Sequence, residues 1–157
     1  MVAMLSKDGM DLYQMIQGSH TGQSFAQFLR LVIAHLDKTV TYGNAIIILD
    51  NCAVHKVEEI RELVDWIDPA TWDPRACTAN KKVRMLFLPA YSPFLNPIEE
   101  VFGWIKRNVK QHRPIDAKDL FNLILLCSRA LQPSMTQKFY QHANSYLPNC
   151  CLSKPIK

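Results

Sequence analysis

Long apolar runs, a secretory leader and paired cysteines are all missing from this chain of 157 residues. No apolar run approaches the roughly 20 residues that a membrane-spanning helix needs, so we expect no membrane partner. The N-terminal stretch MVAMLSKDGMD lacks the basic start and long apolar core of a secretory signal. The five cysteines are odd in number and show no paired CxxC spacing, which argues against a disulfide framework and a zinc site. We therefore expect an intracellular protein.

Acidic side chains are scarce in the last third of the chain. Residues 1–99 carry nine basic and eleven acidic side chains, whereas residues 100–157 carry nine basic and only three acidic ones. The overall net charge of +4 hides this asymmetry. A basic C-terminal third suits a polyanionic partner without requiring one. With 48% hydrophobic residues the chain can bury the core of one globular domain.

Two short apolar runs each lead to a carboxylate. Residues 45–49, AIIIL, are β-branched and continuous, which favours a strand covered on both faces in a parallel or mixed α/β sheet. Asp50 falls at the carboxyl end of this strand, where open α/β sheets place their ligands. A second strand is predicted over residues 83–88, and prolines at 89, 93 and 97 prevent its continuation.

A helix is predicted to begin just after the second strand. Asn96 can cap it, Pro97 suits its first position, and Glu99 lies three residues after the cap. Apolar residues then recur at helical spacing, so one face packs inward and Glu99 lies in the first turn. If the two strands are neighbours, Asp50 and Glu99 can face one crevice.

The remaining elements follow from periodicity and turn residues. Two strands are expected at 2–5 and 12–16 around a turn at 6–9, followed by an amphipathic helix over 25–37. A helix from about residue 56 carries apolar positions to Ile67, and the polar stretch 65–82 is expected to be a surface insertion. Asp116 caps a helix with Leu120 inside, and a last helix opens at Pro133 with Phe139 and Tyr146 as anchors. The predicted order is ββαβαβααα.

The motif ILDN-x3-H, followed by LPAYSPFLNPIEEVFGWIK, resembles the last two acidic motifs of the mariner-like DDE transposases. The resemblance implies an RNase H-like mixed sheet flanked by helices, within a partial catalytic domain over residues 1–148 and a tail over 149–157. It implies that Asp50 and Glu99 are catalytic, metal-binding acids. Asn51, His55 and Asn96 would lie beside the site. The protein would act in the nucleus if its host is eukaryotic.

The sequence departs from the family pattern at several points. The family often has an aspartate where this chain has Phe94, and the 48 residues between Asp50 and Glu99 are more than is typical. The family's first catalytic aspartate, which ends a central strand, has no counterpart, because Asp8 and Asp11 lie in a predicted hairpin turn. We therefore expect an RNase H-like sheet without its first strand, in a fragment or truncated product that is marginally stable alone.

The resemblance also implies a chemistry. In the family, carboxylates hold two Mg²⁺ or Mn²⁺ ions about 4 Å apart, which assist water in nicking DNA and the freed 3′ hydroxyl in attacking target DNA. Hard cations prefer such oxygen ligands. With two of the three acids present, we expect weak metal binding and little or no turnover. The alternative is a non-catalytic nucleic-acid-binding or interaction protein derived from a transposase. Whether the protein forms a homodimer stays open.

Each candidate residue also has a structural interpretation. Glu99 could be the capping partner of Asn96, Asp50 could hold a turn, and His55 could cap a helix or lie on the surface. Four basic residues could bind DNA phosphates or form a solvated helix face; these are Lys106, Arg107, Lys110 and Arg113.

Overall fold

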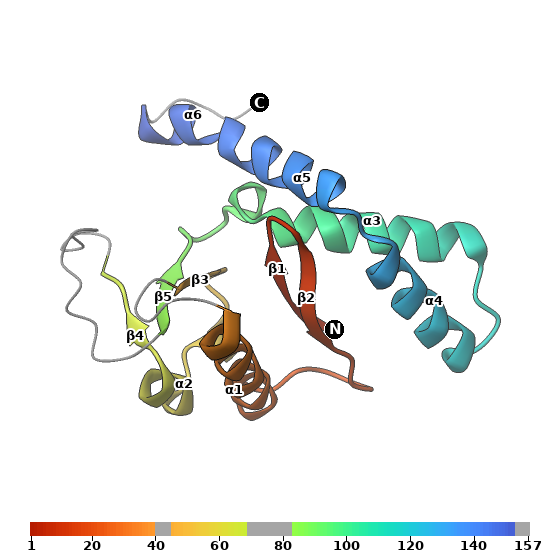
Figure 1. Cartoon of the computed structure of the whole chain (residues 1–157), viewed down its shortest axis with the longest axis horizontal. Helices are drawn as coiled ribbons and strands as arrows, with labels where there is room; N and C mark the ends of the chain where they lie inside the picture. Colours follow the sequence, from red (N-terminus) through yellow and green to blue (C-terminus); the bar gives the residue numbers. More distant parts are fainter. Residues whose placement is uncertain (40–44, 69–82, 153–157) are drawn as a thin grey trace. The chain divides into compact units, whose positions relative to one another are not determined.

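The computed structural model describes residues 1–39, 45–68 and 83–152, which form helices and two small sheets (Figure 1). Contacts divide the chain into two compact units. The first unit holds Met1–Val2 and Tyr13–Ser92, and the second holds Ala3–Leu12 and Pro93–Lys157. The predicted domain of residues 1–148 stays a prediction, and a short helix, α6 (Leu147–Cys151), spans its boundary with the predicted tail.

The N-terminal hairpin consists of β1 (Val2–Ser6) and β2 (Gly9–Gln14), which form a two-stranded sheet. Its turn is short: Asp8 donates its backbone N–H to the Ser6 hydroxyl over 3.2 Å, and Gly9 has φ 147°. Glycine adopts this region of φ at little cost. The predicted turn is confirmed, but β2 begins at Gly9 rather than Leu12, because pairing resumes directly after so short a turn.

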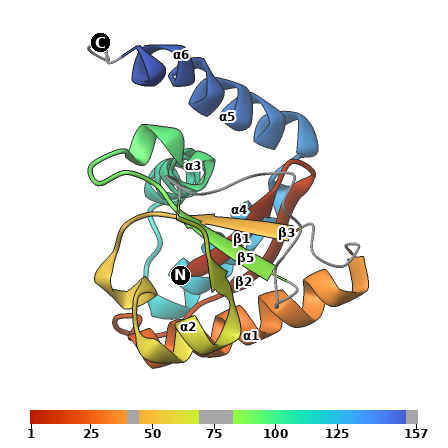
Figure 2. The same cartoon turned by 90° about the vertical axis from the view of Figure 1, so that its left-hand side faces the viewer.

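The first unit is built on α1 (Gly22–Thr39), whose apolar face is buried as predicted. The helix start is fixed by reciprocal hydrogen bonds. Ser24 donates its N–H to Thr21 Oγ1 over 3.2 Å, and Thr21 donates its N–H to Ser24 Oγ over 2.9 Å. Figure 2 shows α1 and α2 (Glu58–Leu63) side by side, and the two helices are in contact.

Three parallel strands form the sheet of this unit. β5 (Val83–Phe87) lies between β3 (Ala45–Leu49) and β4 (Asp65–Trp66) and pairs in parallel with both. The register pairs Ala45 with Val83 and Leu49 with Phe87, so β3 and β5 end together. The two predicted strands are therefore neighbours.

The predicted covering of β3 on both faces is wrong. None of its residues is buried, and Ile48 is 51% exposed. Among the described residues β3 has only β5 as a neighbour, so it lies at an edge of the described sheet. The buried apolar side chains of this sheet belong instead to the central strand, at Val83 and Met85.

The helix predicted to reach Ile67 ends four residues earlier, at Leu63. Val64 takes extended dihedral angles (φ −137°, ψ 154°), and Ile67 donates its N–H to Met85 O over 2.8 Å. Pairing with β5 therefore ends the helix despite its continuing apolar periodicity. β4 takes up the first residues of the predicted insertion at 65–82, and residues 69–82 lie outside the described part of the chain.

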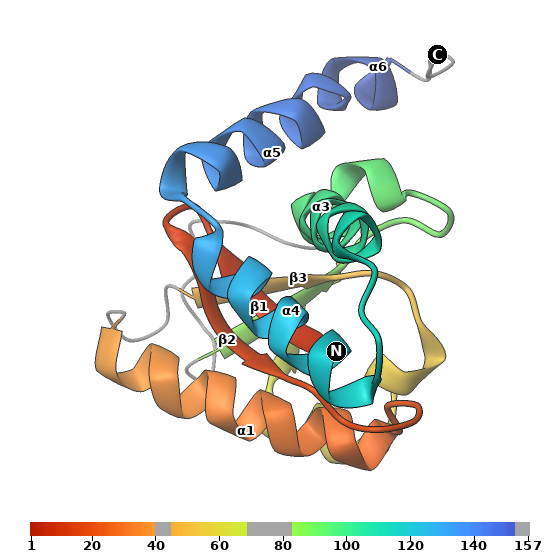
Figure 3. The same cartoon turned by 90° about the vertical axis from the view of Figure 1, so that its right-hand side faces the viewer.

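The helices of the second unit follow a short 3₁₀ turn, η2 (Pro93–Leu95). They are α3 (Pro97–His112), α4 (Ala117–Ala130), α5 (Pro133–Ser145) and α6. α3 contacts both α4 and α5 (Figure 3). The helical spacing predicts five inward-facing residues, namely Ile98, Val101, Phe102, Ile105 and Val109. Val101, Ile105 and Val109 are buried, whereas Ile98 and Phe102 are half-buried.

Two details of this unit differ from prediction. Leu120 of α4 is 39% exposed rather than inside. On α5 the expected anchors Phe139 and Tyr146 are only half-buried, and the buried residues are Thr136 and Ala143. Small side chains let helices approach closely, so apolar size alone did not identify this contact face.

Mixed α/β structure is confirmed by these elements. The described residues form two separate sheets, β1–β2 and β3–β5–β4. The RNase H-like sheet without its central strand stays a prediction. None of the described helices is both long enough and apolar enough to cross a membrane.

Candidate functional site

Asp50 directly follows β3, at the carboxyl end of the parallel sheet. Leu88 donates its N–H to Leu49 O over 2.7 Å, which extends the pairing of the two strands up to this carboxylate. Parallel strands end at one edge of the sheet, where ligands commonly bind. The Asp50 side chain is 49% exposed at this edge.

One oxygen of Asp50 is held by its own loop. His55 Nδ1 lies 2.8 Å from Asp50 Oδ1, and Cys52 donates its backbone N–H to the same oxygen over 3.4 Å. Because a carboxylate only accepts hydrogen bonds, Nδ1 carries the proton in this contact. The second oxygen, Oδ2, has no partner among the described residues. Asp50 therefore both holds a turn and presents a free oxygen.

His55 is held in turn by α1. Its side chain is only 16% exposed, and its ring lies 4.3 Å from the Phe25 ring, centroid to centroid. From the sequence, His55 could be a site residue or a cap or surface residue. The structure brings it to Asp50, within the 3₁₀ turn η1 (Ala53–His55).

Sequence reasoning missed two supports of this loop. A Cβ atom on Gly22 would lie 2.5 Å from Val57 Cγ1, so the start of α1 packs tightly against the chain just after His55. Lys56 lies over the Phe87 ring, with Nζ 5.5 Å from the ring centroid. The glycine at the start of α1, Gly22, was the one sequence feature that could have indicated its close contact with Val57. Asn51, by contrast, is exposed and makes no side-chain hydrogen bond within the described residues.

Glu99 lies in the first turn of α3 and is exposed. Asn96 occupies the N-cap position, but its side chain makes no cap hydrogen bond, so the predicted side-chain cap is wrong. Helix initiation rests instead on Pro97 at the first position and on the Glu99 N–H, which donates to Asn96 O over 3.1 Å. No side-chain capping bond ties Glu99 to Asn96 in the described structure, which weakens the structural interpretation of Glu99.

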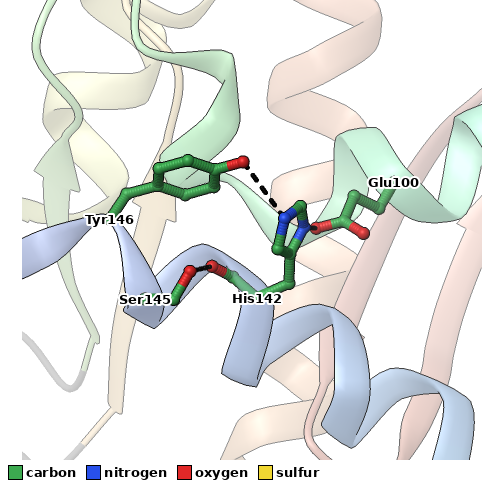
Figure 4. Close-up of polar contacts among 4 residues, drawn as sticks. All are labelled: Glu100, His142, Ser145 and Tyr146. Carbon is green, nitrogen blue, oxygen red and sulfur yellow. Dashed lines mark hydrogen bonds and ion pairs between the residues drawn. The ribbon is translucent and has the colours of Figure 1, made fainter. Parts of the chain in front are cut away.

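The neighbouring Glu100 differs from Glu99 in having a partner. Its Oε1 lies 2.7 Å from His142 Nδ1 on α5, and the Tyr146 hydroxyl lies 3.1 Å from the other ring nitrogen, Nε2 (Figure 4). His142 had no predicted role. Nothing local signals the contact, because the two residues are 42 positions apart in the chain.

The four predicted DNA-binding residues lie at the surface of α3 and at its end. All four are exposed and make no ion pair with another described residue; they are Lys106, Arg107, Lys110 and Arg113. At roughly 100° per residue, Lys106 and Lys110 fall within roughly 20° of Glu99 around the helix axis. Val101 and Ile105 face the opposite way and are buried. Glu99 and the lysines therefore share one solvent-facing side of α3.

The donors suit a hard divalent cation in chemistry and accessibility. Asp50 and Glu99 each offer a carboxylate oxygen without a protein partner among the described residues. Mg²⁺ and Mn²⁺ prefer such oxygen ligands. Within the described residues, no three side chains of His, Cys, Asp or Glu form a group that could hold a metal ion. Asp50 lies in the first unit and Glu99 in the second, so their meeting at one ion stays a prediction.

Comparison with known proteins identifies a family for this chain. A family profile described as DDE superfamily endonuclease matches residues 1–121, which include β1 to α3 and the start of α4. The chain therefore belongs to the DDE superfamily endonucleases. The comparison with curated proteins finds no match.

Proposed function

We propose that the chain is the C-terminal part of a mariner-like transposase catalytic domain, acting on DNA with Asp50 and Glu99 as ligands of Mg²⁺ or Mn²⁺. The observation that carries this proposal is the shared solvent-facing side of α3. Glu99 lies there together with Lys106 and Lys110, none of which has a partner among the described residues. A DNA strand bound by its phosphates along this side would run past the Glu99 carboxylate.

The setting of Asp50 supports the same function. It follows a parallel strand, and His55 engages one of its oxygens while the other is free of partners in the described structure. His55 thereby orients the carboxylate, in the way that partners outside a metal's own ligands commonly do. When bound, the cations would stabilise the charge that develops on phosphate oxygens during strand cleavage. Asn51 and Asn96, both beside these acids in sequence, remain candidates for contacts with substrate.

A second candidate function is non-catalytic DNA binding by a transposase-derived protein. It is favoured by the absence, among the described residues, of a third acidic side chain grouped with either acid. In that case the basic side of α3 would still bind DNA, and the two acids would neither bind a catalytic metal ion nor contribute to cleavage. The two candidates differ in whether the acids matter.

The discriminating experiment combines Mn²⁺ binding with nicking of supercoiled DNA. Glu99→Gln should weaken Mn²⁺ binding, measured by electron paramagnetic resonance, about tenfold or more, because loss of even a partner outside the metal's own ligands commonly weakens binding by that much. Glu59→Gln is the matched control, since Glu59 is also exposed and in the first turn of a helix, α2. Equal Mn²⁺ binding by the two variants would count against Glu99 as a ligand.

Asp50→Asn tests the other acid in the same way. It should weaken Mn²⁺ binding and abolish any Mn²⁺-dependent nicking, whereas Asp8→Asn, in the exposed hairpin turn, should behave as the unmodified chain. DNA binding that persists without nicking, and that neither acid affects, would support the non-catalytic candidate instead.

A further inference from the structure

The end of α5 contacts the chain both before and after the residue at which α3 begins. On the loop side, the Tyr146 ring stacks edge-on against Phe94 of η2, with centroids 5.3 Å apart and planes at 61°. On the helix side, His142 contacts Glu100 over 2.7 Å. The two contacts lie before and after the Asn96–Pro97 junction at which the helix begins.

A single hydrogen-bond chain joins these contacts (Figure 4). The Tyr146 hydroxyl lies 3.1 Å from His142 Nε2, and His142 Nδ1 lies 2.7 Å from Glu100 Oε1. One neutral tautomer satisfies both, with Tyr146 donating to Nε2 and Nδ1–H donating to the carboxylate. Ser145 donates its hydroxyl to His142 O over 2.7 Å, within the last turn of α5. The imidazole is thus held from both ring nitrogens.

α5 itself is anchored independently of His142. Thr136 and Ala143 are buried, and Tyr140 donates its hydroxyl to Leu5 O of β1 over 3.0 Å. His142 and Tyr146 therefore project from a helix that is already fixed within the second unit. A fixed helix can hold a neighbouring segment in place, whereas a loosely attached one could not.

These contacts engage Glu100 but leave the adjacent carboxylate, Glu99, without a partner among the described residues. Consecutive helical residues point roughly 100° apart around the axis. Glu100 is half-buried and engaged by α5, and Glu99 is exposed and without a partner in the described residues. Holding Glu100 on α5 fixes the rotation of the first turn, and with it the direction in which Glu99 points.

We propose that His142 and Tyr146 are positioning residues for Glu99. They hold η2 and the first turn of α3 so that Glu99 alone is presented as a ligand for a divalent cation, while Glu100 anchors the helix. This rests on the proposed function, in which Glu99 binds Mg²⁺ or Mn²⁺. Both residues lie beyond residue 121, where the family match ends.

The test uses His142→Ala, His142→Gln and Tyr146→Phe in the full chain, with two readouts. The first is hydrogen exchange of the amides at the start of α3, and the second is Mn²⁺ binding. His142→Ala should speed exchange there and weaken Mn²⁺ binding about two- to fivefold, because the hydrogen bond that holds Glu100 on α5 is lost. His142→Gln keeps an N–H donor and should restore most of both. Tyr146→Phe keeps the ring on Phe94 and should have a smaller effect.

Gln141→Ala is the matched control, because Gln141 is exposed on the same turn of α5 and should change neither readout. In the Glu99→Gln background, His142→Ala should cause no further weakening of Mn²⁺ binding. Further weakening there, or unchanged exchange in both His142→Ala and Tyr146→Phe, would overturn the proposal. If Glu99→Gln itself leaves Mn²⁺ binding unchanged, the proposed function fails at Glu99 and the positioning role falls with it.

Discussion

At the scale of single residues, the two candidate acids are held by different means. Asp50 is oriented through its side chain, by His55 and by the Cys52 N–H. Glu99 has no side-chain partner among the described residues, so only the backbone of α3 determines where it points. Removal of a neighbouring side chain should therefore affect Asp50 directly and Glu99 only through movement of its helix.

Tyr140 should make the second unit sensitive to alkaline pH. Burial, and secondarily the charge of Asp11, raise the pKa of the Tyr140 phenol above its usual value. The folded chain then holds this proton more tightly than the unfolded chain, so the stabilisation is complete below about pH 10 and is lost as pH rises further. We expect the free energy of unfolding to fall less steeply above about pH 10 in Tyr140→Phe.

Urea unfolding at a series of pH values measures this slope. Tyr140→Phe should also cost about 1 kcal/mol at neutral pH, because Leu5 O loses its donor. Tyr91→Phe, at a ring that is 98% exposed, supplies the baseline for removing a phenol. Identical alkaline slopes for Tyr140→Phe and the unmodified chain would show that Tyr140 does not carry the effect.

At the scale of secondary-structure elements, helix starts are fixed in different ways. α1 uses the reciprocal Thr21 and Ser24 bonds, and α4 uses the side chain of Asp116, which accepts from the Asp119 N–H over 2.7 Å. α3 has a capping residue type at Asn96 but no side-chain cap. Residue type therefore predicts where a helix begins more reliably than it predicts which bond is formed there.

This difference predicts unequal effects of two alanine substitutions. Asp116→Ala should lower the free energy of unfolding by about 1 kcal/mol, because it removes a cap bond. Asn96→Ala removes no such bond and should cost only a few tenths of a kcal/mol. Chemical denaturation of the two variants compares them directly, and an equal decrease would mean that Asn96 also caps its helix.

The contact between the start of α1 and the loop after Asp50 gives an element-scale prediction. Gly22→Ala would bring a Cβ atom within 2.5 Å of Val57 Cγ1, and overpacking of this kind costs about 1 to 3 kcal/mol. Gly103→Ala is the matched control, since its Cβ meets nothing within 4 Å and alanine favours an exposed helix by about 0.5 to 1 kcal/mol. Thermal unfolding should move in opposite directions for the two variants. Adding Val57→Ala to Gly22→Ala should recover part of the stability, and a destabilised Gly103→Ala would contradict this packing account.

At the scale of the whole molecule, charge and topology divide along the chain. The first unit carries the parallel sheet and Asp50, and the second carries the helices α3 to α6, Glu99 and the basic side of α3. The second unit holds ten basic and six acidic side chains, whereas the first holds eight of each, so the polyanion-binding potential is concentrated in the second unit.

DNA binding should reflect this concentration through its salt dependence. The slope of log affinity against log salt should decrease in magnitude by about 0.9 for each phosphate that is no longer neutralised, so by about 1.8 in Lys106→Ala/Lys110→Ala. Lys118→Ala/Lys138→Ala removes the same charge from exposed positions on α4 and α5 and should change the slope less. Fluorescence anisotropy over a range of salt concentrations measures both slopes. Equal decreases would mean that general charge, and not the side of α3, binds DNA.

Local sequence determined where most elements lie. The apolar period of α1, the β-branched run of β3 and the Asp116 cap act over a few neighbouring residues, so composition and spacing were enough to predict them. The motifs around Asp50 and Glu99 were likewise sufficient to indicate the DDE superfamily, which the family match over residues 1–121 supports.

Tertiary structure decided what depends on partners distant in sequence. α2 ends at Leu63 because the following residues pair with β5, although its apolar pattern continues to Ile67. Glu100 is distinguished from Glu99 by a histidine 42 positions away, and Gly22 is required by its approach to Val57. Such contacts arise only when the chain has folded back on itself, and no local spacing encodes which surfaces then meet.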